Sequence, residues 1–109
     1  MDELARGRAN DFLTRAAGYI QSTLRVEVKH DDIVVLFQRG EAYQLESEKD
    51  FVRYMLIAIA AGSGAATPDP DWIRDVMSRP ASTNQLKLRS LFRAAHDRLP
   101  ADVARRAGS

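Results

Sequence analysis

Residues 43–62 read YQLESEKDFVRYMLIAIAAG, and the polar first half of this stretch changes abruptly into the seven apolar residues MLIAIAA. Seven residues are too few to cross a membrane, which requires roughly 20. Ser47, followed three residues later by Asp50, forms a variant of the capping box that starts a helix. Gly62 is suited to the left-handed residue that ends one. Because the segment is apolar on nearly all sides, it predicts a core helix at 47–61 around which other helices pack.

Apolar residues recur at helical spacing in four further segments of the chain. Asp69-Pro70 is a suitable start for one of them, because aspartate caps a helix and proline at the first position loses no needed hydrogen bond. Ser82 or Thr83 is expected to cap the last long helix, and the tail at 101–109 to add at most a frayed turn. The sequence therefore predicts an all-α fold, a single compact bundle of about five helices at 2–23, 32–45, 47–61, 70–79 and 83–99.

Residues 24–37 allow an alternative, an α+β fold with a β-hairpin, because an alternating run, the polar KHDD and the β-branched IVVLF follow one another. Against this, the apolar residues of 33–43 recur at helical spacing, and Asp31 or Asp32 would cap a helix there. We therefore favour the helix. Gly40 falls within its apolar face, which predicts that another helix approaches closely at that point.

Length and composition indicate one domain, 1–109, with a single core, since the chain has 109 residues of which 45% are apolar. There is no cysteine, which excludes disulfides and thiolate zinc sites. The charged start MDELARGRANDF lacks the apolar segment of a secretory signal, so we expect a cytoplasmic protein with no membrane partner. The residues predicted to be buried together are Phe37, Phe51, Met55, Trp72, Leu91 and Phe92.

The formal charge is +1, but it is unevenly distributed. Residues 26–77 carry ten acids and five bases, whereas residues 78–109 carry seven bases and two acids. Segments of opposite charge attract each other within a fold or attract partners of opposite sign. The bases of the last helix are split between both flanks of its apolar stripe, which is not typical of a helix that reads a nucleic-acid groove. Nucleic acid is therefore not the expected partner.

Three short motifs lie at a familiar spacing: RGEAY at 39–43, SEKD at 47–50 and DPDW at 69–72. With the apolar helix between them, they resemble a family of small helical proteins encoded in bacterial type VI secretion gene clusters, beside spike and effector genes. The resemblance covers roughly residues 33–99. This chain departs from the family pattern at two positions: Gln44 replaces the glycine of the family's Tyr-Gly pair, and Asp71 replaces the family's second proline. It implies an accessory, chaperone-like or adaptor role in a bacterial cytoplasm.

No catalytic, cofactor-binding or metal-binding residue is predicted. The adjacent residues 30–32 (HDD) rarely converge on one ion, because they share a single backbone turn. His96 has no neighbouring serine and orienting acid with which to activate a nucleophile. The GSG at 62–64 lacks the lysine and the preceding strand of a phosphate-binding loop. We expect that the protein is not an enzyme and uses no cofactor.

The function that remains is that of a non-enzymatic partner-binding adaptor or chaperone-like accessory protein, whose partner is another protein such as a secretion effector or spike component. An immunity-type inhibitor of a toxin and a nucleic-acid-binding helical domain are the alternatives, and self-association is left open. The predicted partner-binding residues are Leu86, which faces away from the apolar stripe of its helix, and Arg89 and Arg93 on the same side. In a purely structural alternative, Leu86 folds under the first turn and both arginines pair with Glu41, Glu46 or Asp50.

Overall fold

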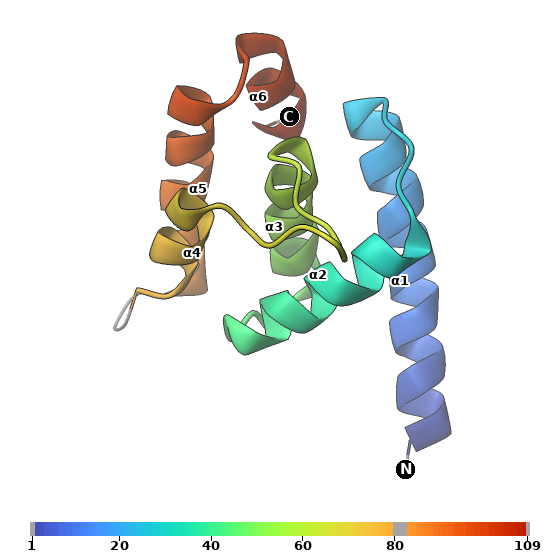
Figure 1. Ribbon diagram of the computed structural model, residues 1–109. Coiled ribbons are helices and arrows are strands. Elements are labelled where there is room, and N and C mark those ends of the chain that lie inside the picture. Colours follow the sequence, from blue (N-terminus) through green and yellow to red (C-terminus); the bar gives the residue numbers. More distant parts are fainter. Residues whose placement is uncertain (1, 80–82, 109) are drawn as a thin grey trace.

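The computed structural model describes residues 2–79 and 83–108, with side chains described for residues 11–79 and 83–107. Within these residues the chain is helical and contains no strand, so the predicted all-α fold is confirmed. The hairpin at 24–37 is wrong, because one helix extends to Leu24 and the next begins at His30. The six described helices, shown in Figure 1, are α1 (Asp2–Leu24), α2 (His30–Ala42), α3 (Glu48–Ala60), α4 (Asp71–Met77), α5 (Asn84–Arg98) and α6 (Ala101–Gly108).

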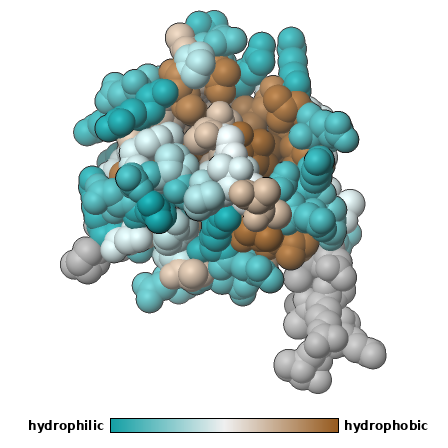
Figure 2. Space-filling view, viewed as in Figure 1, coloured by the Kyte–Doolittle hydropathy of each residue, from teal (hydrophilic) through white to brown (hydrophobic). Residues whose placement is uncertain are grey.

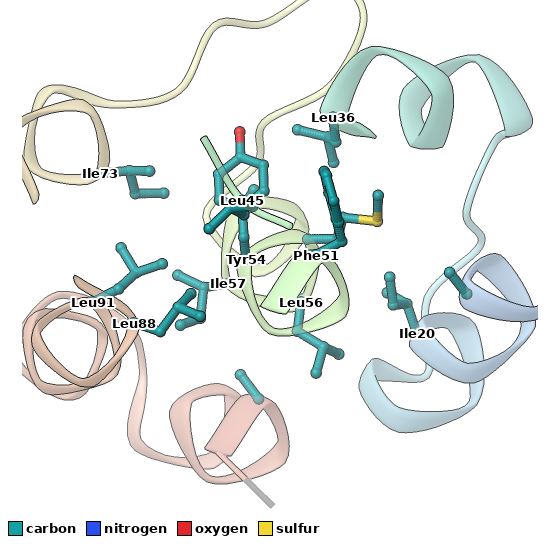
Figure 3. Packing of buried hydrophobic residues seen from close by; sticks show 14 of the residues in the cluster. Ile20, Leu36, Leu45, Phe51, Tyr54, Leu56, Ile57, Ile73, Leu88 and Leu91 are labelled. Carbon is teal, nitrogen blue, oxygen red and sulfur yellow. The ribbon is translucent and has the colours of Figure 1, made fainter. Parts of the chain in front are cut away.

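Helix α3 lies in the middle of the molecule. Helices α1, α2, α5 and α6 pack directly on it, and α4 is attached through α5 (Figure 1). Figure 3 looks along α3 and shows its side chains pointing in different directions: Phe51 toward Leu36 of α2, Ile57 toward Leu88 of α5, and Leu56 away from both. All five of these residues are buried. A helix that is apolar on nearly all sides is therefore the centre of the core, as its sequence predicts.

The ends of α3 follow the predicted signals. The Ser47 hydroxyl accepts a hydrogen bond of 3.1 Å from the Asp50 amide, which satisfies one of the unpaired donors at the start of the helix. At the other end Gly62 has φ +93°. The Gly62 amide donates to the Ile59 carbonyl and the Ser63 amide to the Ala58 carbonyl, the two bonds of a Schellman motif.

Two of the other predicted caps are wrong. Asp31 and Asp32 do not precede α2 but lie inside its first turn. Their negative charges interact favourably there with the positive end of the helix dipole. Asp69 does not cap α4, since the proline that follows it occupies the cap position and no side chain caps that helix. For α5 the cap is Thr83, whose hydroxyl accepts from the Leu86 amide at 3.2 Å; Ser82 lies outside the described residues.

The tail forms a helix of its own, α6. The described chain therefore has six helices, one more than the approximately five that the sequence predicts. Helix α6 contacts α1, α3 and α5, and its Ala104 and Ala107 side chains are buried. Two small side chains one turn apart let α6 approach its neighbours closely. Tertiary packing, which the local sequence does not reveal, stabilises a segment that was expected to fray.

The predicted core is correct in part. Of the six predicted residues, Phe51, Met55 and Leu91 are buried, whereas Phe37, Trp72 and Phe92 pack against the core and remain partly exposed. The rings of Phe37 and Phe51 stack with centroids 4.6 Å apart, and Phe12 of α1 contacts both rings at 6.0 and 6.4 Å. The aromatic cluster thus joins α1, α2 and α3 at the edge of the core.

Some apolar side chains reach the surface. In Figure 2 apolar residues are visible mainly on the upper and right parts of the face shown, whereas the lower left is mostly hydrophilic. Among the residues whose side chains the structure describes, the exposed large apolar ones are Tyr19, Val26 and Leu86, at 49%, 44% and 51%. None of the described helices combines the length and the apolar character needed to cross a membrane.

The close approach predicted at Gly40 is present. Gly40 is buried, and a Cβ atom built on it would lie 2.7 Å from two ring atoms of Phe51. We expect Gly40→Ala to lower the free energy of unfolding by up to about 2 kcal/mol, because overpacking against the stacked rings costs about 1–3 kcal/mol and exceeds the roughly 1 kcal/mol gained in helix propensity. Gly18→Ala is the control, since nothing lies within 4 Å there, and it should stabilise the protein. Urea denaturation measures both; a more stable Gly40→Ala protein would contradict this packing.

The end of α2 contains a strained residue. Gln44 has φ +70°, and the Gln44 and Leu45 amides donate to the Glu41 and Gly40 carbonyls, which completes a second Schellman motif. Glycine adopts this conformation without the cost of about 1 kcal/mol that a side chain adds. We therefore expect Gln44→Gly to raise the free energy of unfolding by about 1 kcal/mol, whereas Gln38→Gly, within the same helix, lowers it by about 1 kcal/mol. Equal effects of the two substitutions in urea denaturation would refute the strain at Gln44.

Candidate partner-binding groove

A buried carboxylate joins the loop at 62–70 to helices α2 and α3. The Asp69 side chain is only 1% exposed. Its Oδ2 atom accepts hydrogen bonds from the hydroxyls of Tyr54, at 2.5 Å, and Tyr43, at 3.0 Å. Its Oδ1 atom lies 3.4 Å from Nη1 of Arg39, which supplies the compensating charge. A carboxylate removed from water in this way is stable only when such donors and a cation surround it.

Two side chains of α2, Arg39 and Asp32, also bind the backbone of the same loop. The Arg39 guanidinium donates to the carbonyls of Thr67 and Gly64, at 3.3 and 3.0 Å. The Asp32 carboxylate accepts from the Ala65 amide at 2.8 Å. The loop is thereby fixed along α2, which explains why Asp69 and Asp32 are not available as helix caps.

The cluster of Asp69, Tyr43, Tyr54 and Arg39 has a structural role. Both oxygens of the Asp69 carboxylate are engaged, and the side chain is enclosed, so it has no free face for a substrate. Burial, and then the neighbouring Asp69 carboxylate, raise the pKa of Tyr43 and Tyr54 far above the usual value of 10.0. Both hydroxyls therefore remain protonated donors at neutral pH, and the cluster positions the loop.

An open groove of about 840 Å³ lies along α3 between α1 and α5. Its volume is in the range of ligand-binding pockets in proteins. Leu56 points from α3 toward this side of the molecule, between α1 and α6 (Figure 3). The floor is apolar and is formed by Phe12, Ala16, Val52, Leu56, Phe92 and Ala107. Four helices contribute to it, so the groove exists only in the folded bundle.

The rim of the groove is polar and mostly basic. Its charged residues are one acid, Glu48, and four bases, Arg15, Lys49, Arg53 and Arg89. The Arg15 guanidinium lies 3.3 Å from the Asp11 carboxylate and 3.7 Å from that of Glu48. The other three bases form no ion pair within the described part of the chain. Tyr19, half exposed, adds an aromatic ring to the rim.

The structure places the three predicted partner-binding residues on two neighbouring sides of α5. Arg89 lines the groove, together with Gln85 and Phe92 on the same side of the helix. Leu86 and Arg93 are exposed on the adjacent side and do not line it. Neither arginine pairs with Glu41, Glu46 or Asp50 within the described residues, and Leu86 is 51% exposed rather than folded under the first turn.

Sequence reasoning missed the contributions of α1 and α3 to the groove. Lys49, Val52, Arg53 and Leu56 recur at helical spacing along one side of α3. This stripe mixes bases with apolar residues, whereas the rest of α3 is predominantly apolar, and that mixture is the signal that could have identified an uncovered side. The facing residues on α1 carry no comparable signal, because only the fold brings them opposite α3.

The tyrosine–aspartate cluster makes stability sensitive to high pH. A tyrosine whose pKa is raised on folding stabilises the protein fully below its unfolded value of about 10, and this contribution is lost as the pH rises further. We expect the free energy of unfolding to fall above about pH 10, and to fall less steeply in Tyr54→Phe, which lacks the buried hydroxyl. Urea denaturation between pH 8 and about 11 measures these slopes.

The matched control is Tyr19→Phe, because Tyr19 is half exposed and outside the cluster. The loss of slope should be confined to the variant that lacks the buried Tyr54 hydroxyl. A Tyr54→Phe slope identical to that of the wild type would show that the buried hydroxyl does not titrate with unfolding.

Comparison with protein-family models, curated proteins and solved structures gives no match for this chain. Function is therefore inferred from the geometry of the groove and from the residues that line it.

Proposed function

We propose that this protein is a non-enzymatic adaptor or chaperone-like accessory protein that binds a segment of another protein in the groove between α1, α3 and α5. The observation that carries the proposal is the combination of an apolar floor with a charged rim in a groove of about 840 Å³. Protein interfaces have this organisation, with an apolar centre and a polar edge. Arg89 on the rim and the half-exposed Tyr19 belong to the residue types that contribute most at such interfaces.

The resemblance to accessory proteins of type VI secretion clusters supports a spike component or an effector as the partner. An immunity-type inhibitor would use the same groove to bind a toxin, so the identity of the bound protein separates the two functions. Leu86 and Arg93, beside the groove on α5, are available to extend the contact beyond its rim.

The test replaces an apolar residue of the groove floor with a charge. Val52 is partly exposed on the floor, and Val52→Glu would place a carboxylate where the partner's apolar side chains are proposed to lie. The partner is recovered from the native bacterium with the wild-type protein, identified by mass spectrometry and purified. We expect its dissociation constant, measured by isothermal titration calorimetry, to rise at least about tenfold for Val52→Glu, because burying an unpaired charge is costly.

The matched control is Val26→Glu, which introduces the same charge at a valine that is 44% exposed and does not line the groove. This variant should bind as the wild type does, and circular dichroism should show equal helicity for all three proteins. Wild-type affinity in the Val52→Glu protein would show that the partner binds elsewhere.

A further inference from the structure

The groove carries an imbalance of charge that the fold itself does not use. Lys49, Arg53 and Arg89 form no ion pair within the described residues, although the chain as a whole holds nearly as many acids as bases. Arg53 is partly buried where it lines the groove, and no carboxylate of the described residues forms an ion pair with it. A partner that presents carboxylates beside an apolar surface would pair with these bases and cover the apolar floor of the groove at the same time.

We infer that the occupant of the groove is an amphipathic helix of the partner, with acidic residues on both sides of an apolar stripe. This inference rests on the proposed function and specifies the chemistry of the bound segment. The bases belong to two different helices, Lys49 and Arg53 to α3 and Arg89 to α5, so carboxylates are needed on more than one flank of the stripe.

The dimensions of the floor fit two turns of a helix. Floor and rim residues extend from Phe12 to Tyr19 on α1 and from Glu48 to Leu56 on α3. These spans of seven and eight residues of rise correspond to about 10 and 12 Å. A helix that presents apolar residues at positions i, i+3, i+4 and i+7 covers that length, and this is the general mode in which grooves between helices bind helices.

An extended peptide fits this site less well. Strand addition requires an exposed sheet edge, and the described residues contain no strand. The backbone groups of α1, α3 and α5 are already paired within their helices, so the groove offers side chains rather than a ladder of backbone donors and acceptors. A helix satisfies its own backbone and needs only this side-chain surface.

The acidic character follows from the rim. A segment rich in lysine or arginine would bring like charges close to Lys49, Arg53 and Arg89, whereas glutamate or aspartate would pair with them. Glu48, the only acid among the described lining residues, is itself 3.7 Å from Arg15. The apolar floor distinguishes this site from a purely electrostatic one, because a simple polyanion leaves Val52 and Phe92 uncovered.

The test uses three synthetic, fluorescently labelled helices of about 15 residues, a length at which an isolated helix becomes marginally stable. The first carries leucines at i, i+3, i+4 and i+7 with glutamates on both flanks. The second keeps the leucines and replaces the glutamates with lysines, and the third keeps the glutamates and replaces the leucines with serines. Fluorescence anisotropy should show the wild-type protein binding the first at least about tenfold more tightly than either of the others, and more weakly as salt is added.

Charge reversal on the protein provides the second arm. The Arg53→Glu/Arg89→Glu variant should bind the glutamate-flanked helix about tenfold less tightly and the lysine-flanked helix more tightly than the wild type does. The control is Lys29→Glu/Arg98→Glu, which changes the total charge equally at two exposed bases outside the groove and should bind as the wild type does. Circular dichroism checks the helicity of both variants.

Other outcomes would overturn the inference. Equal binding of the serine-containing acidic helix, or tighter binding of a DNA duplex than of the leucine–glutamate helix, would make the groove a general anion site. Equal impairment of the control variant would place the contact outside the groove. If none of the three helices binds while Val52→Glu still weakens the native partner, the acidic helix is excluded and the proposed function stands. If Val52→Glu leaves that partner's affinity unchanged, the proposed function fails independently.

Discussion

Helix α3 is apolar on nearly all of its sides, and burying all of them requires several neighbouring helices. Tyr54, Met55, Ile57 and Ala58 are fully buried, and Leu56 is almost fully buried. These five residues are consecutive in the chain, so their side chains point in different directions around the helix. No single neighbour can cover such a helix, and each large apolar side chain gains about 1.5–3 kcal/mol when it leaves water. Four other helices accordingly surround α3, including the short α6 at the end of the described chain.

A polar cluster completes what the apolar core begins. The loop after α3 must return across α2, and it is held there by the hydrogen bonds and the charge that converge on the buried Asp69 carboxylate. Arg39, Tyr43 and Asp69 come from the same short motifs that carry the resemblance to type VI secretion accessory proteins, and Gly40 lies against Phe51. These motif residues thus have structural roles, and the surface proposed to bind a partner is formed by other residues.

The groove is a consequence of how α3 is covered. Its neighbours enclose most of its surface, but the side that carries Lys49, Val52 and Arg53 remains open between α1 and α5, and Ala107 of α6 contributes only a small side chain there. An apolar floor left in contact with water is a source of binding free energy for another molecule. Under the proposed function, the bases around that floor that form no ion pair within the described residues would select among molecules, because electrostatic complementarity contributes more to selectivity than to affinity.

Local features could be predicted from the sequence: the helical periodicity, the cap at Ser47, a cap at either Ser82 or Thr83, and the left-handed end of α3 at Gly62. The sequence also indicated Gly40 as a point of close approach, because a glycine within an apolar stripe has a geometric reason to be there. Each of these signals depends on residues within a few positions of one another. Three other features arise only when the helices pack together: Asp69 turns inward to two tyrosines and an arginine, the tail folds as α6, and α1, α3 and α5 form a groove. Those outcomes join residues that are distant in the chain, and their free energy arises from burial and charge pairing that exist only after the helices have packed.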